Sequence, residues 1–286
     1  MASCIAYRGA TPSIRLPADG LRADQAPHPV GAGGWSERND RRVASEREGL
    51  MRNIKEFSDD RQNDWCLHCA RTLASLKTNK DHVPTKSLLR LPHPANLPLI
   101  QVCAECNGSF AKDEEYFVAF LSSAVSGTTD PSKQIHPVAA RILEKQTSLR
   151  ARIERAARRY TTHGGENRVL WEPEKGRIER VIIKNARGHA YYEFGEPMLE
   201  QPSRTWAVPL IAMSGEEREK FEAIPFNDGF PEVGSRMMTR VMTGEDLDGS
   251  WVCVQDGVYR YAVAQEGAIL VRSIIFDFLA TEVRWD

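Results

Sequence analysis

Two cysteine pairs in the first half of the chain have residue types and a spacing that suit metal chemistry. Cys66 and Cys69 form one Cys-x-x-Cys pair, and Cys103 and Cys106 form the other. Four thiolates in this pattern are typical of a closed tetrahedral zinc site, which stabilises a fold and leaves no open coordination position. The sequence therefore predicts a structural zinc ion bound by all four cysteines.

An Asp-His dipeptide, Asp81-His82, lies between the two pairs, and Asn107 directly follows the last cysteine. Carboxylate and carboxamide oxygens suit a hard divalent metal such as Mg²⁺ or Mn²⁺, and a neutral imidazole can take a proton from water. The apolar spacing over residues 105–124 predicts a helix with Asn107 in its first turn, where the helix dipole favours a phosphate oxygen. Together these residues indicate hydrolysis of a phosphodiester.

The order of these residues resembles that of the HNH endonucleases, the ββα-metal or His-Me finger family. It is most similar to the zinc-stapled branch that includes phage recombination endonuclease VII, and the likeness covers roughly residues 62–125. The resemblance implies that His82 is the general base and that Asp81 and Asn107 hold a catalytic Mg²⁺ or Mn²⁺. It also implies that Asn96 braces the loop that carries His82.

The same residues have plainer interpretations. An Asp-His pair taken alone is more often a surface turn, and Asn96 after Pro-Ala is also an ordinary turn residue. His68 lies inside a cysteine pair, but four thiolates complete a zinc shell, so we expect no role for it. The alternative to a nuclease is a non-catalytic, zinc-stabilised module that binds nucleic acid or protein. A nuclease acting on RNA is a third interpretation, which no aromatic stacking platform favours.

The composition bounds the compartment and the partners. No run approaches about 18 apolar residues, so we expect no membrane span, and the cysteine usage and the lack of an apolar leader predict a cytoplasmic location. Net charge is −1, but residues 141–187 carry 13 Lys or Arg against 6 Asp or Glu, and residues 192–286 carry 8 against 17. The basic segment predicts contact with double-stranded DNA, and the acidic segment predicts a protein partner.

We predict an α+β fold in four parts. Residues 1–49 form a disordered or non-native extension, with Met51 as an alternative start, and residues 50–126 form a zinc-bound ββα-metal nuclease core. A basic amphipathic helix linker follows over 127–165, and an α+β domain with an antiparallel sheet over 166–286. In the core, residues 72–76 and His82-Val83 are expected to pair as a hairpin. A cutter of both strands is expected to be a homodimer, because one HNH site cuts one strand. Analogy alone suggests a defence, mobile-element or recombination system.

Periodicity supplies the remaining elements. Residues 131–160 are expected to form one long helix in which Arg152, Arg155 and Arg159 share a face and contact nucleic acid. Further along, we expect a helix over 178–190, a capping box at Ser214 and Glu217, and strands at 169–171, 206–213, 251–254, 258–263, 268–276 and 278–285.

Overall fold

The computed structural model describes residues 16–17, 51–54, 64–161, 165, 167–224, 231, 233–265 and 267–286. They form a mixed helix and sheet fold of the predicted α+β class. The predicted extension over residues 1–49 lies outside the described residues except for β1 (Leu16–Pro17), which pairs with β5 (Asn167–Trp171). Within the described part, no helix is both long enough and apolar enough to cross a membrane.

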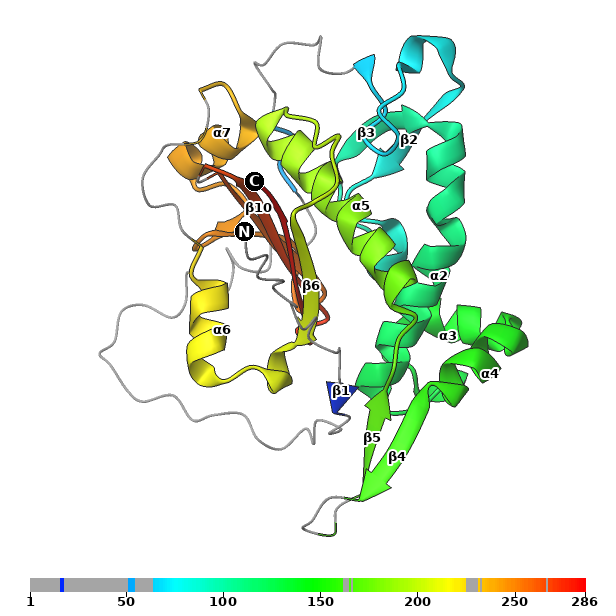
Figure 1. Ribbon diagram of the computed structural model, residues 1–286. Coiled ribbons are helices and arrows are strands. Elements are labelled where there is room, and N and C mark those ends of the chain that lie inside the picture. The colour runs from blue at the N-terminus through cyan, green and yellow to red at the C-terminus, as the bar shows by residue number, and fades with distance from the viewer. Residues whose placement is uncertain are drawn as a thin grey trace, which may run out of the picture.

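A two-stranded hairpin leads directly into a long helix in the cysteine region (Figure 1). Strand β2 (Thr78–His82) pairs antiparallel with β3 (Leu99–Cys103), and α2 (Ala104–Ser126) begins at the next residue. Cys103 caps that helix, because its Sγ accepts a hydrogen bond from the backbone N–H of Cys106. A short 3₁₀ helix, η3 (Lys86–Leu88), lies in the connection between the two strands. The chain therefore runs strand, strand, helix in this region.

The predicted strand at residues 72–76 is wrong. Leu73–Ser75 form a 3₁₀ helix, η2, and strand pairing begins only at Thr78. The first cysteine pair makes a tight turn, in which the N–H of Ala70 donates to the carbonyl of Cys66 and the N–H of Cys66 donates to the carbonyl of Arg71. An isolated bridge from Trp65 to Thr72 closes this turn. These residues are therefore used by the turn and are not free to join the hairpin.

The predicted single helix over residues 131–160 is also wrong. The segment contains η4 (Pro131–Lys133), α3 (Pro137–Lys145), α4 (Thr147–Arg155) and strand β4 (Ala157–Thr161), which pairs with β5. Gln146 separates the two helices with a ψ of 75°, outside the helical range. Its side-chain amide donates to Glu115 of α2 at 2.8 Å. This tertiary contact accompanies a break that apolar periodicity alone does not reveal.

The C-terminal part consists of helix α5 (Lys175–Phe194) and an antiparallel sheet with the strand order β6-β11-β10-β9-β8-β7. Its elements are β6 (Arg204–Pro209), η5 (Leu210–Ala212), α6 (Gly215–Glu222), α7 (Arg236–Thr243), β7 (Leu247–Asp248), β8 (Trp251–Gln255), β9 (Tyr259–Gln265), β10 (Ile269–Ile275) and β11 (Leu279–Trp285). The predicted helix, strands and capping box are confirmed here, except that the strand expected to reach residue 213 ends at Pro209.

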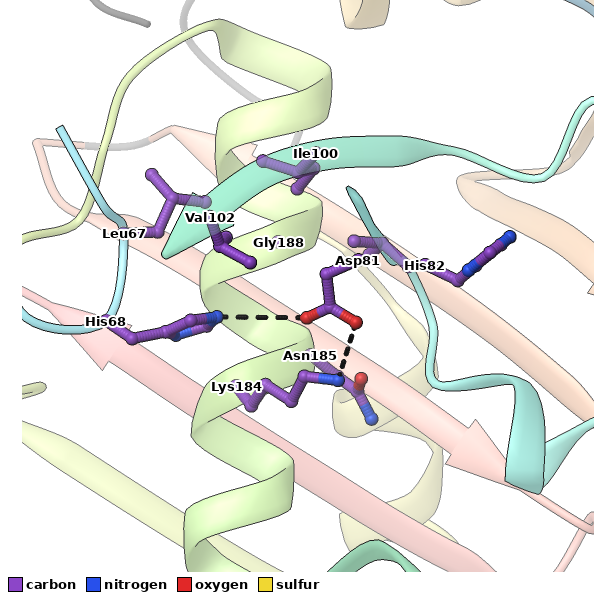
Figure 2. A pocket seen from close by; sticks show the side chains of 10 residues that line it. Leu67, His68, Asp81, His82, Ile100, Val102, Lys184, Asn185 and Gly188 are labelled. Atoms are coloured by element: carbon purple, nitrogen blue, oxygen red, sulfur yellow. Dashed lines mark hydrogen bonds and ion pairs between the residues drawn. The ribbon is translucent and has the colours of Figure 1, made fainter. Parts of the chain in front are cut away.

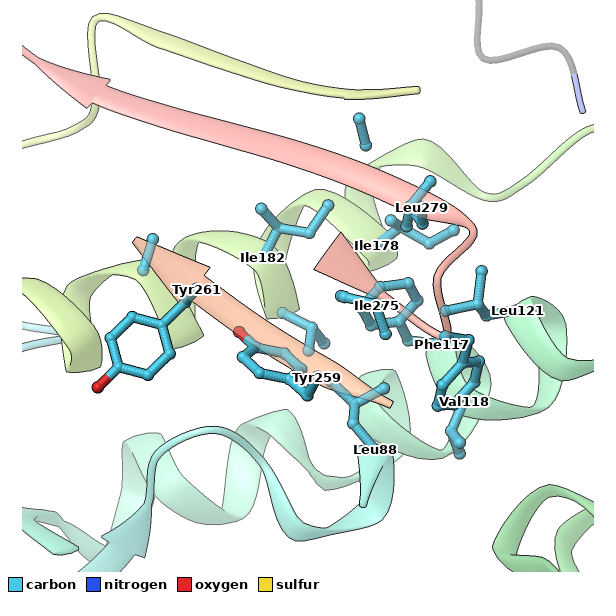
Figure 3. Packing of buried hydrophobic residues seen from close by; sticks show 14 of the residues in the cluster. Leu88, Phe117, Val118, Leu121, Ile178, Ile182, Tyr259, Tyr261, Ile275 and Leu279 are labelled. Carbon is cyan, nitrogen blue, oxygen red and sulfur yellow. The ribbon is translucent and has the colours of Figure 1, made fainter. Parts of the chain in front are cut away.

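One hydrophobic core joins the two halves of the chain. Helix α5 lies between α2 and the sheet and contacts both (Figure 1). Figure 3 shows Phe117 of α2, Ile182 of α5 and Ile275 of β10 in one buried cluster. The core therefore extends across the predicted boundary between residues 165 and 166. Burial of apolar side chains holds the hairpin-helix region against the sheet.

Burial of His136 makes the stability of this core depend on pH. The ring is fully buried, lies 5.0 Å from the Phe276 ring between centroids, and has a pKa lowered by burial to about 4. In the unfolded chain the pKa is near 6.5. Between these values the unfolded chain binds the proton and the folded chain does not, so stability falls as pH falls.

When the pH is lowered from 7 to 5, the free energy of unfolding should fall in wild type because His136 is buried. In a His136→Leu variant we expect this fall to be smaller by about 2 kcal/mol. Urea denaturation at the two pH values measures this difference. An equal loss in both proteins would show that His136 does not contribute to acid sensitivity.

Candidate functional site

The four cysteines of the two pairs form one cluster. Their Sγ atoms all lie within 4.8 Å of one another, and those of Cys66 and Cys69 are 3.6 and 3.8 Å from that of Cys103. A disulfide requires about 2.05 Å between sulfurs. Four thiolates about 2.3 Å from a tetrahedral zinc ion lie about 3.8 Å apart. The cluster, completed by Cys106, therefore fits a structural metal such as zinc, as the spacing predicts.

Charge around the cluster favours bound metal. Nε of Arg71 donates to Sγ of Cys69 at 3.3 Å, and the same guanidinium makes an ion pair with Glu105. Burial acts to raise the pKa of Cys69, but the hydrogen bonds with Arg71 outweigh it and lower the pKa to about 6. Burial raises the pKa of Cys66 and Cys106. A metal ion bound to the cluster would stabilise the thiolate forms of these two side chains.

Asp81 is buried and is bound by a lysine from α5. Its Oδ1 accepts a hydrogen bond from Nζ of Lys184 at 3.0 Å, and the same ammonium group donates to Thr85 Oγ1 at 2.9 Å and to Glu114 Oε1 at 2.5 Å. Figure 2 shows the Asp81 carboxylate and the Lys184 amine directed at each other. Burial acts to raise the pKa of Asp81, but His68 and Lys184 outweigh it and lower the pKa. Asp81 is therefore an ionised carboxylate with a fixed partner.

His68, for which we expected no role, belongs to the same cluster. Its Nε2 lies 3.9 Å from Oδ2 of Asp81, at ion-pair distance, and its ring meets that of Phe110 edge-on at 4.8 Å between centroids. Burial lowers the pKa of His68, so its ring is neutral near pH 7. Because the four cysteines would complete a zinc site without it, His68 can link the first cysteine pair to Asp81.

His82 lies on the other side of strand β2. Successive side chains of a strand point to opposite faces, and Figure 2 shows the imidazole of His82 directed away from Asp81 and Lys184. The side chain is half-buried. Burial lowers its pKa, and the charge of Lys86 adds to the effect. The ring is therefore neutral near pH 7, which is the state a general base requires.

Asn107 lies in the first turn of α2, as predicted. Its Nδ2 donates to Oδ1 of Asn79 at 3.0 Å, which ties the helix to strand β2. Asn79 is two residues before Asp81, so the two side chains leave β2 on the same face. The structure thus brings the start of α2 and the face of β2 that carries Asp81 together.

Asn96 has a different contact from the one implied by the resemblance. It is exposed, has a left-handed φ of 61°, and donates through Nδ2 to the carbonyl of Met51 at 3.0 Å. Asparagine tolerates this backbone conformation better than most residues. Its hydrogen bond fastens the connection between β2 and β3 to the N-terminal segment and not to His82.

Helix α5 is positioned against the hairpin by a close contact. A side chain at Gly188 would place its Cβ 2.6 Å from Val83, so only glycine lets the helix approach this far. One turn earlier, Oδ1 of Asn185 accepts from the N–H of Thr85 at 3.1 Å. Arg187 donates to the carbonyl of Leu67 at 3.3 Å and so also holds the first cysteine pair.

Sequence reasoning missed Lys184 and Glu114 as partners of Asp81. Lys184 lies 103 positions from Asp81, and no local pattern links the two. In the sequence, Lys184 was recognised only as one of the basic residues of segment 141–187. Its burial, with 4% of its surface exposed, is the signal that the structure adds.

The three arginines predicted to share a helix face do not do so. Arg152 and Arg155 are on α4, whereas Arg159 is on β4. Arg152 makes an ion pair with Glu174 at 2.9 Å. All three are exposed, so they remain on the surface of the same region of the chain.

Lys184 occupies the position beside Asp81 in which a divalent metal would bind. It neutralises the Asp81 carboxylate, while Asn107 uses its Nδ2, not its Oδ1, to hydrogen bond to Asn79. The pocket beside Asp81 has a volume of about 10 Å³, which is about the space of one water. The site predicted for a catalytic metal is therefore closed by α5.

The chain matches no family model, no curated protein and no solved structure. Its function is therefore inferred from its own residues and their geometry.

We expect Cys66→Ser or Cys106→Ser to release one equivalent of zinc per chain, because three thiolates bind the metal far more weakly than four. The hairpin and the start of α2 would lose their common anchor, so Tm should fall by several degrees, with about 3 °C per kcal/mol as the scale for a chain of this size. Metal analysis of the purified proteins and thermal unfolding measure both effects.

Cys253→Ser is the matched control. This cysteine lies on β8 and is outside the cluster, so the variant should keep its zinc. Unchanged zinc content and Tm in Cys66→Ser would show that the cluster does not bind zinc.

Proposed function

We propose that the chain is an endonuclease of the HNH type that hydrolyses DNA phosphodiester bonds. One observation carries the proposal. The Asp81-His82 strand and the Asn107 helix start lie beside a single four-thiolate cluster, and a hydrogen bond from Asn107 to Asn79 joins helix and strand. The Asp81 face of β2 and the start of α2 thus lie together, which supports the proposal, while the imidazole of His82 points to the other face of the strand.

In this proposal His82 takes a proton from the attacking water. Its lowered pKa favours the neutral ring near pH 7. Asn107 binds a phosphate oxygen in the first turn of α2, where the helix dipole is positive. Asp81, once released from Lys184, and Asn107 would hold a divalent metal, which would supply stabilisation of negative charge at the phosphate. Because Lys184 now neutralises Asp81, the proposed activity belongs to a state in which that carboxylate has been released.

A second candidate function is a non-catalytic, zinc-stabilised module that binds nucleic acid or protein. The ion pair between Lys184 and Asp81 favours it, because a buried and neutralised carboxylate is a structural feature in many proteins. In this case the Asp-His dipeptide joins the hairpin to α5 and does no chemistry.

We expect His82→Ala to lower plasmid cleavage in Mg²⁺ or Mn²⁺ by about 10²–10⁴-fold, the usual contribution of a general base. Zinc content and fold should not change, because His82 lies outside the thiolate cluster. Supercoiled plasmid, run beside both proteins at equal zinc content, is the substrate.

His136→Leu is the control, since it removes a histidine from the core and not from the site. Equal cleavage by wild type and His82→Ala would rule out His82 as the base. No cleavage by wild type, together with DNA binding, would favour the non-catalytic module.

The proposed DNA-binding surface includes the exposed arginines near β4. We expect the double variant Arg155→Glu and Arg159→Glu to bind duplex DNA more weakly. The slope of log affinity against log salt should shrink by about one unit for each phosphate that the variant no longer binds. Fluorescence anisotropy at several salt concentrations measures the slope.

The double variant Arg218→Glu and Lys220→Glu makes the same charge change on α6, in the acidic part of the chain. It should affect DNA binding less. Equal effects of the two variants would indicate that net charge, not a surface near β4, governs binding.

A further inference from the structure

We propose that Lys184 is a built-in cation that occupies a divalent-metal position formed by Asp81, Thr85 and Glu114, and that it excludes metal from Asp81. The biological role of this site rests on the proposed nuclease function, but the claim about metal binding does not. Thr85 and Glu114 would supply metal-ligating oxygens beside Asp81, and Lys184 of α5 would keep the metal out.

The geometry around the Lys184 ammonium is that of a cation site. Three oxygens surround Nζ, those of Asp81 at 3.0 Å, Thr85 at 2.9 Å and Glu114 at 2.5 Å. An ammonium group has three donors, so each is satisfied. Two carboxylates and a hydroxyl are oxygen donors, which hard divalent cations prefer. The lysine therefore sits where such an ion would bind.

The charges favour a divalent ion once the lysine has left. Asp81 and Glu114 carry two negative charges, and Lys184 supplies one positive charge, so the cluster retains one negative charge. A divalent ion would balance both carboxylates. Without any cation, two carboxylates would remain close together with low exposure, which is costly.

Helix α5 controls whether Lys184 can leave. Gly188 lies one turn after Lys184 on the same helix face and is in close contact with Val83. Asn185 holds the N–H of Thr85. The Lys184 amine also lies 5.6 Å from the centre of the Phe110 ring. Because these contacts fix the helix and enclose the amine, metal binding at Asp81 requires the lysine or α5 to move.

The test is Mn²⁺ binding by the full-length, zinc-loaded protein, followed by electron paramagnetic resonance of the free ion. Lys184→Met removes the charge and the hydrogen bonds, so its flexible side chain is no longer held in the position of the ion. We expect it to bind one Mn²⁺ at least about a hundredfold more tightly than wild type, because a full positive charge is removed from the position of the ion. Mn²⁺ should also raise the Tm of the variant and leave that of wild type unchanged.

Two variants show where the ion binds. Arg180→Met removes the same charge one turn earlier on α5, where the arginine pairs with Asp113, and should bind Mn²⁺ as wild type does. Adding Asp81→Asn to Lys184→Met should abolish the new binding. If Lys184→Met does not fold, Lys184→Gln is measured in its place, since its amide can still hydrogen bond to the carboxylates.

Mn²⁺ binding of equal strength in wild type and Lys184→Met, or no binding in either, would overturn the proposal. So would tight binding that survives the Asp81→Asn change. Tight binding by Lys184→Met without DNA cleavage would leave the exclusion of metal by Lys184 standing and would count against the nuclease. The two proposals can therefore fail independently.

Discussion

The clustering of four cysteine sulfurs at a spacing that fits one metal ion is the constraint on which the rest of this region depends. Their Sγ atoms lie within 4.8 Å of one another, and burial raises the pKa of Cys66 and Cys106. A metal cation such as zinc would stabilise four thiolates at this range. Cys103 belongs at once to the cluster, to the end of β3 and to the cap of α2. The cysteine cluster therefore ties the start of α2 to the end of the hairpin.

The second constraint is the close approach of α5 to the hairpin. Gly188 permits backbone contact with Val83, and the residues one turn earlier reach Thr85 and Asp81. Asp81 thus lies in an interface between two parts of the chain and not in an open cleft. An interface of this kind is stable in its closed form, because removing either partner of a buried ion pair leaves an unpaired charge. Asp81 can bind a metal or substrate only if α5, or Lys184 on it, moves away.

Local patterns predicted those parts of the fold whose causes are local. Cys-x-x-Cys spacing indicated the cluster, and the strands expected at 251–254 and 258–263 correspond to β8 and β9, which are joined by a turn in which Gly257 has a φ of 63°. The helix over residues 131–160 was wrong because its break depends on a contact between Gln146 and Glu115, which lies in another helix. The sequence did not reveal the ion pair of Asp81 for the same reason, since its partner Lys184 is 103 positions away. Periodicity reports which face is buried, but not which buried charge finds a partner.

The metal cluster and the α5 interface are physically coupled through the first cysteine pair. His68 lies between Cys66 and Cys69 and approaches Asp81 at 3.9 Å, while Arg187 of α5 donates to the carbonyl of His68 at 3.4 Å. Disruption of the cysteine cluster would free the turn of the first cysteine pair. It would thereby disturb His68 and the contact of this turn with α5, which carries Lys184. Conversely, a shift of α5 would remove Lys184 from Asp81 and Arg187 from the cysteine turn in the same movement. The cysteine cluster and α5 therefore meet at the same turn, and both contribute neighbours to Asp81.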